Sequence, residues 1–229
     1  MKRFWKDVAI VPQDGGWGIA LDGRPMRTPH RAPLVASSAA LAKAIAAEWQ
    51  AQGETIDPRA MPMTGLANAA IDLATADPAG FAEPIAAYAA TDLLCYRDDR
   101  DAALQAEQVA AWNPILAWAE AQFGVEFVIT QGILPVDQPT ATIEALRDAT
   151  LGYESWRMTA LTPLVTIGGS LVAGLACINQ AFGSELLWEA VSLDQLYQER
   201  RWGADAQAQA QRAAHKRDWD NAVRFLTYL

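Results

Sequence analysis

Apolar and polar residues alternate over short stretches at the start of the chain, as in half-buried strands. Residues 7–11 and 17–21 are the clearest, with a turn cluster between them. Asp22-Gly23 then indicates a hairpin, because both residues tolerate a positive φ. The returning strand, over residues 24–28, contains a proline and is followed by another, which limits it to an edge. We therefore expect a small β-rich part at the N-terminus.

From residue 39 the apolar spacing changes to three and four, which is typical of helices. Ser37 or Ser38 is expected to cap the first helix, over 39–52, and Gly53 to end it. Thr64 is expected to cap the second, and Pro114 leaves a break open within a later one. Further helices are predicted over 64–75, 78–91, 102–123, 140–151, 158–184, 184–203 and 204–229, with a strand over 125–129.

These patterns predict an α+β protein, in which a small mainly β N-terminal domain is followed by a larger all-helical domain. We expect the β domain to cover residues 1–60 and the helical domain residues 61–229. The boundary could extend to about residue 100.

The stretch from 158 to 184 holds 27 residues without a charge, which is long enough to cross a bilayer. Pro163, Asn179 and Gln180 interrupt it, however, and no cluster of Lys or Arg brackets it. A membrane span and a buried central helix are both compatible with the length. We favour the buried helix and expect no membrane insertion.

Composition narrows the classes of partner. The net charge of −9 argues against nucleic acid as the main partner, because nucleic acid needs basic patches. Cys95 and Cys177 lie in apolar runs and are expected to be buried and reduced. The two histidines are far apart, so a zinc site is not expected. The N-terminus has no apolar signal-peptide core, which points to a cytoplasmic protein.

Catalytic motifs are scarce. The sequence contains no phosphate-binding loop, no dinucleotide fingerprint and no nucleophile elbow. Asp98, Asp99 and Asp101 lie in a charged stretch, where a solvated turn is favoured over a Mg²⁺ site. We therefore assign no catalytic residue, metal or cofactor. The alternative is a metal- or nucleotide-dependent hydrolase that uses Asp92, Asp98 and Asp99.

The helix that ends at Gly203 carries the strongest candidate site. Four of its residues share one polar face, at positions i, i+3, i+4 and i+7, and they are Gln195, Gln198, Glu199 and Trp202. The apolar side chains of this helix lie on another side. A large aromatic beside a carboxylate on a polar face indicates contact with a partner.

Two further places carry weaker signals. Trp49 is expected either to anchor its helix on the β part or to contact a partner. Asp92 and Arg97 bracket four largely apolar residues. They are expected to hold a buried turn through an ion pair, or to bind a partner.

Several strings, taken in order, resemble the Atp12 family of assembly chaperones. They are Arg3-Phe4-Trp5-Lys6, Leu21-Asp22-Gly23-Arg24-Pro25, Arg27-Thr28-Pro29, Glu48-Trp49-Gln50-Ala51-Gln52, Met61-Pro62-Met63-Thr64, Thr91-Asp92-Leu93-Leu94-Cys95-Tyr96-Arg97 and Gln198-Glu199-Arg200-Arg201-Trp202-Gly203. The resemblance implies an orthogonal helical bundle after the β domain. It also implies a non-enzymatic chaperone, here a bacterial one, which holds the free α subunit of the F1 part of ATP synthase. We expect the chaperone to be a monomer when free.

The resemblance also refines the site. Family members tend to carry acidic residues just before the Gln of the motif, and Asp194 fits that pattern, while Gln195 replaces a common Glu. Ala204 and Ala206 dilute the acidic character after the motif. We therefore rank Glu199 and Trp202 above Asp194 as partner-binding residues.

Overall fold

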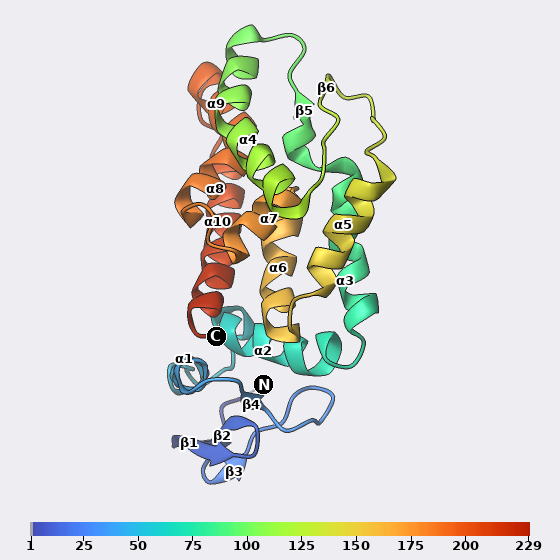
Figure 1. The fold of residues 1–229 in the computed structure, drawn as a ribbon. Helices are drawn as coiled ribbons and strands as arrows, with labels where there is room; N and C mark the ends of the chain where they lie inside the picture. Colours follow the sequence, from blue (N-terminus) through green and yellow to red (C-terminus); the bar gives the residue numbers. More distant parts are fainter. Residues whose placement is uncertain (1) are drawn as a thin grey trace. The chain divides into compact units, whose positions relative to one another are not determined.

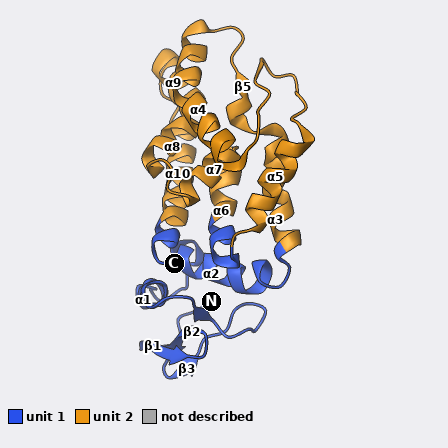
Figure 2. Ribbon diagram, in the orientation of Figure 1, with its two compact units in different colours: residues 1–78, 154–160, 224–229 blue, residues 79–153, 161–223 orange. Residues whose placement is uncertain are grey.

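The computed structural model describes residues 2–229, which form two compact units. The first, called the N-terminal unit, contains the chain as far as Pro78 together with residues 154–160 and 224–229. The second, called the helical unit, contains residues 79–153 and 161–223 (Figure 2).

A small antiparallel sheet opens the N-terminal unit. Strands β1 (Val8–Gln13) and β2 (Gly16–Leu21) pair along their whole length. The short strands β3 (Arg24–Pro25) and β4 (Val35–Ala36) both pair with β2. The hairpin predicted at Asp22-Gly23 is confirmed, since both residues have positive φ, 47° and 78°. The returning strand is shorter than predicted, because proline cannot donate to the ladder and β3 ends at Pro25.

Helix α1 (Ala39–Gln50) begins where predicted. The Ser38 side chain accepts a hydrogen bond from the Leu41 amide at 3.0 Å, as an N-cap does. Leu41 and Ile45 of α1 belong to the hydrophobic core of this unit, together with Ile19 of β2. The core buries apolar surface from both the sheet and the helix, which stabilises the unit.

Helix α2 (Pro62–Ala69) begins two residues before the predicted cap, Thr64. The Glu48 carboxylate of α1 accepts hydrogen bonds from the backbone amides of Met63 and Thr64 at 2.7 and 2.8 Å. A side chain distant in sequence thus satisfies the first amides of α2, in place of a local cap. A 3₁₀ turn (Pro58–Ala60) precedes α2, and a π-helical turn (Ala70–Ala74) follows it.

Helices dominate the rest of the chain (Figure 1). They are α3 (Pro78–Ala86), α4 (Ala102–Phe123), α5 (Thr140–Leu151), α6 (Ser155–Gly168), α7 (Leu171–Ile178), α8 (Ser184–Val191), α9 (Leu193–Trp202) and α10 (Ala206–Thr227). Two 3₁₀ turns (Ala87–Thr91 and Leu93–Cys95) precede the short strand β5 (Tyr96–Arg97), which pairs in parallel with β6 (Thr130–Gln131). The α+β class, with a small sheet followed by a larger helical part, is confirmed.

The helix predicted over 158–184 is two helices. Gly169 has a φ of 67°, and the Ser170 side chain accepts a hydrogen bond from the Ala173 amide at 2.9 Å, so α6 ends and α7 begins within two residues. All eight residues of α7 are buried, as predicted for a central segment. No helix within residues 2–229 has both the length and the apolar character needed to cross a membrane.

The strand predicted over 125–129 is wrong. Side chains of the following segment take the hydrogen bonds that a strand partner would supply. Thr142 bonds the backbone of Glu126, and Gln138 bonds the Val128 backbone amide and carbonyl at 3.0 and 2.8 Å. Strand pairing begins only at Thr130.

Of three predicted helix limits, the structure differs from the first two and confirms the third. Pro114 lies within α4 without ending it. The helix predicted over 184–203 divides at Ser192 into α8 and α9. The predicted stop at Gly203 is confirmed, because its φ of 92° suits glycine and its amide bonds the Glu199 carbonyl at 3.0 Å.

Candidate partner-binding site

The polar face predicted on α9 forms one wall of a groove of about 420 Å³ in the helical unit. All four predicted residues of that face line it, namely Gln195, Gln198, Glu199 and Trp202. The first half of α10 forms the opposite wall, with Ala208, Gln209, Gln211, Arg212 and His215. The helical spacing read from the sequence thus groups side chains that the structure places in one groove, which we call the polar groove.

Trp202 gives the polar groove an exposed aromatic ring. The residue is 71% exposed, whereas Trp112 and Trp219 in the same unit are fully buried. An exposed tryptophan leaves a large apolar surface in water. Tryptophan is also among the residues that most often carry binding energy at protein interfaces. Trp202 is therefore available to a partner without any rearrangement of the core.

Glu199 has a different role from Trp202. Its carboxylate accepts hydrogen bonds from the side chains of Gln209 and Arg212, and it forms an ion pair with Arg212. These hydrogen bonds lower the pKa of the Glu199 carboxyl. The residue thus joins α9 to α10 and fixes the width of the groove.

Asp194 lies on another side of α9. It accepts a hydrogen bond from the Gln108 side chain of α4 at 2.8 Å, and the Gln108 oxygen in turn accepts the Asp98 amide at 2.7 Å. Burial raises the pKa of the Asp194 carboxyl. This carboxylate is half-buried inside the unit and does not line the polar groove.

The side of α9 that faces α4 is held by charged and hydroxyl groups. The Tyr197 hydroxyl donates a hydrogen bond to Asp101 at 2.8 Å, and Arg201 forms an ion pair with the same carboxylate at 2.9 Å. The adjacent Arg200 pairs with Glu107, further along α4. α9 is therefore fixed to α4 on one side and to α10 on the other.

Trp49 has the contacts of a packing anchor within the N-terminal unit. Its indole nitrogen donates a hydrogen bond to the Thr64 hydroxyl at 3.2 Å, and its ring lies 4.9 Å from that of Trp5. These contacts bind α1 to α2 and to the start of the chain. Trp49 does not line the polar groove.

Asp92 is fully buried in the helical unit and has a structural role. Its carboxylate accepts hydrogen bonds from the Leu94 amide at 3.0 Å and the Val172 amide at 2.9 Å. Burial raises the pKa of the Asp92 carboxyl to about 6, although these hydrogen bonds favour the ionised form and lower the pKa. Asp92 therefore joins the 3₁₀ turn at 93–95 to the first turn of α7.

Arg97 is close to Asp92 in sequence and is also buried, but its hydrogen-bond partners differ from those of Asp92. Its guanidinium donates to the Leu94 carbonyl and to the Asn113 side chain, the latter at 2.8 Å, and it lies 4.9 Å from the Trp112 ring. The expected ion pair between Asp92 and Arg97 is thus replaced by separate sets of contacts. Burial leaves neither side chain a surface for a partner.

The carboxylates of the alternative hydrolase have structural partners. Asp98 accepts the backbone amides of Arg100 and Asp101 at 2.8 and 2.6 Å, as in a tight turn. Asp99 lies 3.8 Å from the Arg100 side chain. Among the residues that the structure describes, no group of three or more His, Cys, Asp or Glu side chains is placed to hold a metal.

Sequence reasoning missed the second wall of the polar groove. The first half of α10 is rich in alanine and glutamine and carries no aromatic residue that would attract attention. The one signal for this wall in the sequence is the charge of Arg212, a cation on the helix after Glu199 that could pair with its carboxylate. The chain turns back after Gly203, and that turn brings the two together.

Comparison with known proteins places the chain among chaperones. The model of the family described as ATP12 chaperone protein matches residues 2–120. The mitochondrial protein atp12 of Schizosaccharomyces pombe is 26% identical over 220 residues, covering 89% of this chain and 74% of that protein. The crystal structure of Atp12 from Paracoccus denitrificans has a TM-score of 0.92 and 39% identity, and the match covers 99% of this chain and 97% of that one.

A second structure agrees with the first. The crystal structure of the Atu1473 protein from Agrobacterium tumefaciens has a TM-score of 0.92 and 36% identity, covering 99% of this chain and 85% of that one. The chain therefore belongs to the ATP12 chaperone protein family, as the ordered strings of the sequence indicated.

Proposed function

We propose that this chain, as a member of the ATP12 chaperone protein family, binds the free α subunit of the F1 part of ATP synthase. It would cover the surface of that subunit that later meets a β subunit. Such surfaces are large and apolar, so they favour aggregation while they are exposed. The observation that carries the proposal is the polar groove with Trp202 exposed at its edge.

Binding of a protein partner requires no catalytic group in the polar groove. The groove offers amides, two carboxylates, a guanidinium, an imidazole and one indole. These groups can form hydrogen bonds and apolar contacts, which suits recognition of a protein surface. We propose a non-enzymatic chaperone that works without a cofactor, as a monomer, in the bacterial cytoplasm. Its relatives in Paracoccus and Agrobacterium support a bacterial setting.

The direct test is capture of isolated F1 α subunit by the purified chain. We expect a complex, together with less light scattering from the α subunit on dilution from denaturant. Trp202→Ala should weaken the complex at least about tenfold, as loss of an aromatic anchor does. Phe4→Ala is the matched control, because Phe4 is 64% exposed and lies in the N-terminal unit. It should bind as the wild type does.

The effect of Trp202→Ala on binding is easier to interpret than that of Glu199→Lys. A lysine at position 199 would face Arg212 and would open the junction between α9 and α10, so a binding defect would have two causes. If the wild-type chain forms no complex and does not reduce aggregation, the proposed function is wrong. Calorimetry that showed tight binding of Mg²⁺ or a nucleotide would instead favour the hydrolase.

A further inference from the structure

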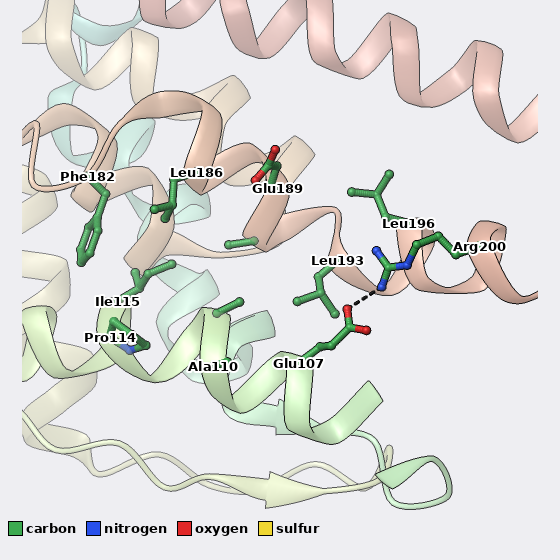
Figure 3. Close-up of a pocket in the computed structure, with 12 residues that line it drawn as sticks. Glu107, Ala110, Pro114, Ile115, Phe182, Leu186, Glu189, Leu193, Leu196 and Arg200 are labelled. Carbon is green, nitrogen blue, oxygen red and sulfur yellow. Dashed lines mark hydrogen bonds and ion pairs between the residues drawn. The ribbon is translucent and has the colours of Figure 1, made fainter. Parts of the chain in front are cut away.

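A second groove, of about 630 Å³, lies in the helical unit (Figure 3). Its α9 residues lie on the side of that helix opposite to the polar groove. Helix α4 forms one wall, and helices α8 and α9 form the other. Its apolar lining includes Ala110, Pro114, Ile115, Leu186, Leu193 and Leu196. We call it the apolar groove.

The floor of the apolar groove is fixed, while its edge is open. Ile115 is fully buried and Leu193 is 8% exposed, so both are held by the packing of the unit. Leu186 at the edge is 49% exposed. The apolar lining of this preformed groove remains in contact with water. A partner that covers it removes apolar surface from water, which lowers the free energy of the complex.

An ion pair, an aromatic ring and a carboxylate define the ends and the rim of the apolar groove. The ion pair between Glu107 and Arg200 closes one end, and Phe182 lies at the other (Figure 3). Glu189 is exposed on α8 at the rim. Since Arg200 is already paired with Glu107, the unbalanced charge of the lining is the Glu189 carboxylate. The groove therefore favours a partner that carries a basic residue beside its apolar side chains.

The backbone of the walls indicates the form of the partner. Both walls are helices, whose amides and carbonyls are already bonded within each helix, so they present no sheet edge to a strand. An extended peptide on this floor would bury unpaired backbone groups, which costs about 1–3 kcal/mol each. A helix satisfies its own backbone, and the apolar face of an amphipathic helix suits such a groove.

We propose that the apolar groove binds an amphipathic helix of the partner protein, with a lysine or arginine of that helix beside Glu189. The inference rests on the proposed function, because it gives the same partner a second contact. α9 then serves both contacts. Leu193, Leu196 and Arg200 face the apolar groove, and the residues of the polar face line the other.

Two synthetic peptides test the groove independently of the α subunit. Each is a helix of about 18 residues with leucines on one face. One carries lysines beside that face, and the other carries glutamates. Measured by fluorescence anisotropy with the full chain, the lysine peptide should bind at least about tenfold more tightly. Equal affinities, or no binding of either peptide, would overturn the inference.

Substitutions locate the binding. Leu186→Asp should lower the affinity for the lysine peptide at least about tenfold, because the substitution places a charge on the apolar edge of the groove. Leu73→Asp is the matched control, since Leu73 is 48% exposed but belongs to the N-terminal unit. Glu189→Lys should reverse the preference between the two peptides, whereas Glu144→Lys on α5 should not. Binding that persists unchanged in Leu186→Asp contradicts the assignment.

The same variants separate this inference from the proposed function. In capture of the F1 α subunit, Leu186→Asp should weaken the complex as Trp202→Ala does. If Trp202→Ala weakens capture and Leu186→Asp does not, the chaperone function stands and the apolar groove is not its second contact. If the wild-type chain captures no α subunit, the proposed function itself fails, whatever the peptides show.

Discussion

Asp92 and Glu199 are both carboxylates at helix junctions, yet their surroundings shift their pKa values in opposite directions. Burial raises the pKa of Asp92, whereas hydrogen bonds from Gln209 and Arg212 lower that of Glu199. The first residue supports the interior of the helical unit, and the second fixes the groove that we propose for the partner. Residue type alone does not distinguish these roles.

Asp92 should make stability depend on pH. Its folded pKa of about 6 lies above the ordinary 3.8, so the folded state holds a proton that the unfolded chain releases. The stability from this group is complete below the ordinary pKa and is lost as the pH rises through about 6. From about pH 5 to about pH 7.5 we expect the free energy of unfolding to fall by roughly 1 kcal/mol through this residue.

The measurement is urea unfolding of the wild type and of Asp92→Asn across that pH range. The asparagine variant does not titrate, so its deficit relative to the wild type should shrink as the pH rises. The variant should also be less stable at every pH, because its amide group meets backbone donors where a carboxylate accepts them. A deficit that stays constant with pH would contradict the assigned pKa.

Residues within one helix could be placed from the sequence, while contacts between distant residues could not. The groove-lining face of α9 followed from helical spacing, because that geometry is local. The partner of Asp92, Val172, is 80 residues away, and nothing near Asp92 indicates it. The expected pairing with Arg97 used proximity in sequence, but Arg97 instead reaches Asn113.

At the scale of elements, helix ends were predicted best where a glycine needs a positive φ. The predicted ends at residue 123 and at Gly203 agree with α4 and α9, since Gly124 and Gly203 have φ values of 67° and 92°. Helix α1 instead ends at Gln50, before the predicted stop at Gly53, with Ala51 as its C-cap. Gly169 was missed, because small residues are common in the uncharged stretch and none of them stands out. The break matters, since it lets Ser170 and Asp92 bond the first amides of α7.

Close packing of α6 on α7 depends on Gly174. A methyl group there would lie 2.9 Å from the Leu161 side chain and 2.8 Å from that of Val165, both of which are fully buried. Gly174→Ala should therefore reduce the free energy of unfolding by about 1–3 kcal/mol through overpacking. Chemical denaturation followed by circular dichroism measures the change.

Gly65→Ala on α2 is the matched control. It lies within a helix, and a methyl group there would meet nothing within 4 Å. Because alanine favours helices over glycine, it should raise the stability by up to about 1 kcal/mol. If both variants lose stability equally, close approach at Gly174 is not the reason.

At the scale of the whole molecule, the chain returns to its N-terminal unit twice, with residues 154–160 and 224–229. Trp156 and Phe225 stack there at 6.2 Å, and Phe225 belongs to the same core as strand β2. The helix predicted over 204–229 carries Phe225, whereas the helix predicted over 158–184 begins after Trp156, which the structure places in α6. The sequence pattern contains no information about which unit each helix end joins. That choice depends on long-range packing.

The two cysteines offer a probe of the helical unit as a whole. Cys95 is fully buried and Cys177 is 7% exposed, and burial raises their pKa values to about 12 and about 11. Because only the thiolate reacts, we expect neither to be labelled by Ellman's reagent in the native protein. In a urea titration both should become reactive together with the loss of helical signal. Rapid labelling in the native state would show that the unit opens locally.

α9 has only ten residues, and both of its sides are committed to grooves. Each residue of a helix is rotated by about 100° from the one before it. A single inserted or deleted residue within 193–202 would therefore turn everything after it, moving Glu199 away from Arg212 and Trp202 off the edge of its groove. A substitution on this helix changes one contact, whereas a change in its length displaces every contact that follows, so natural variation here should take the form of substitutions without insertions or deletions.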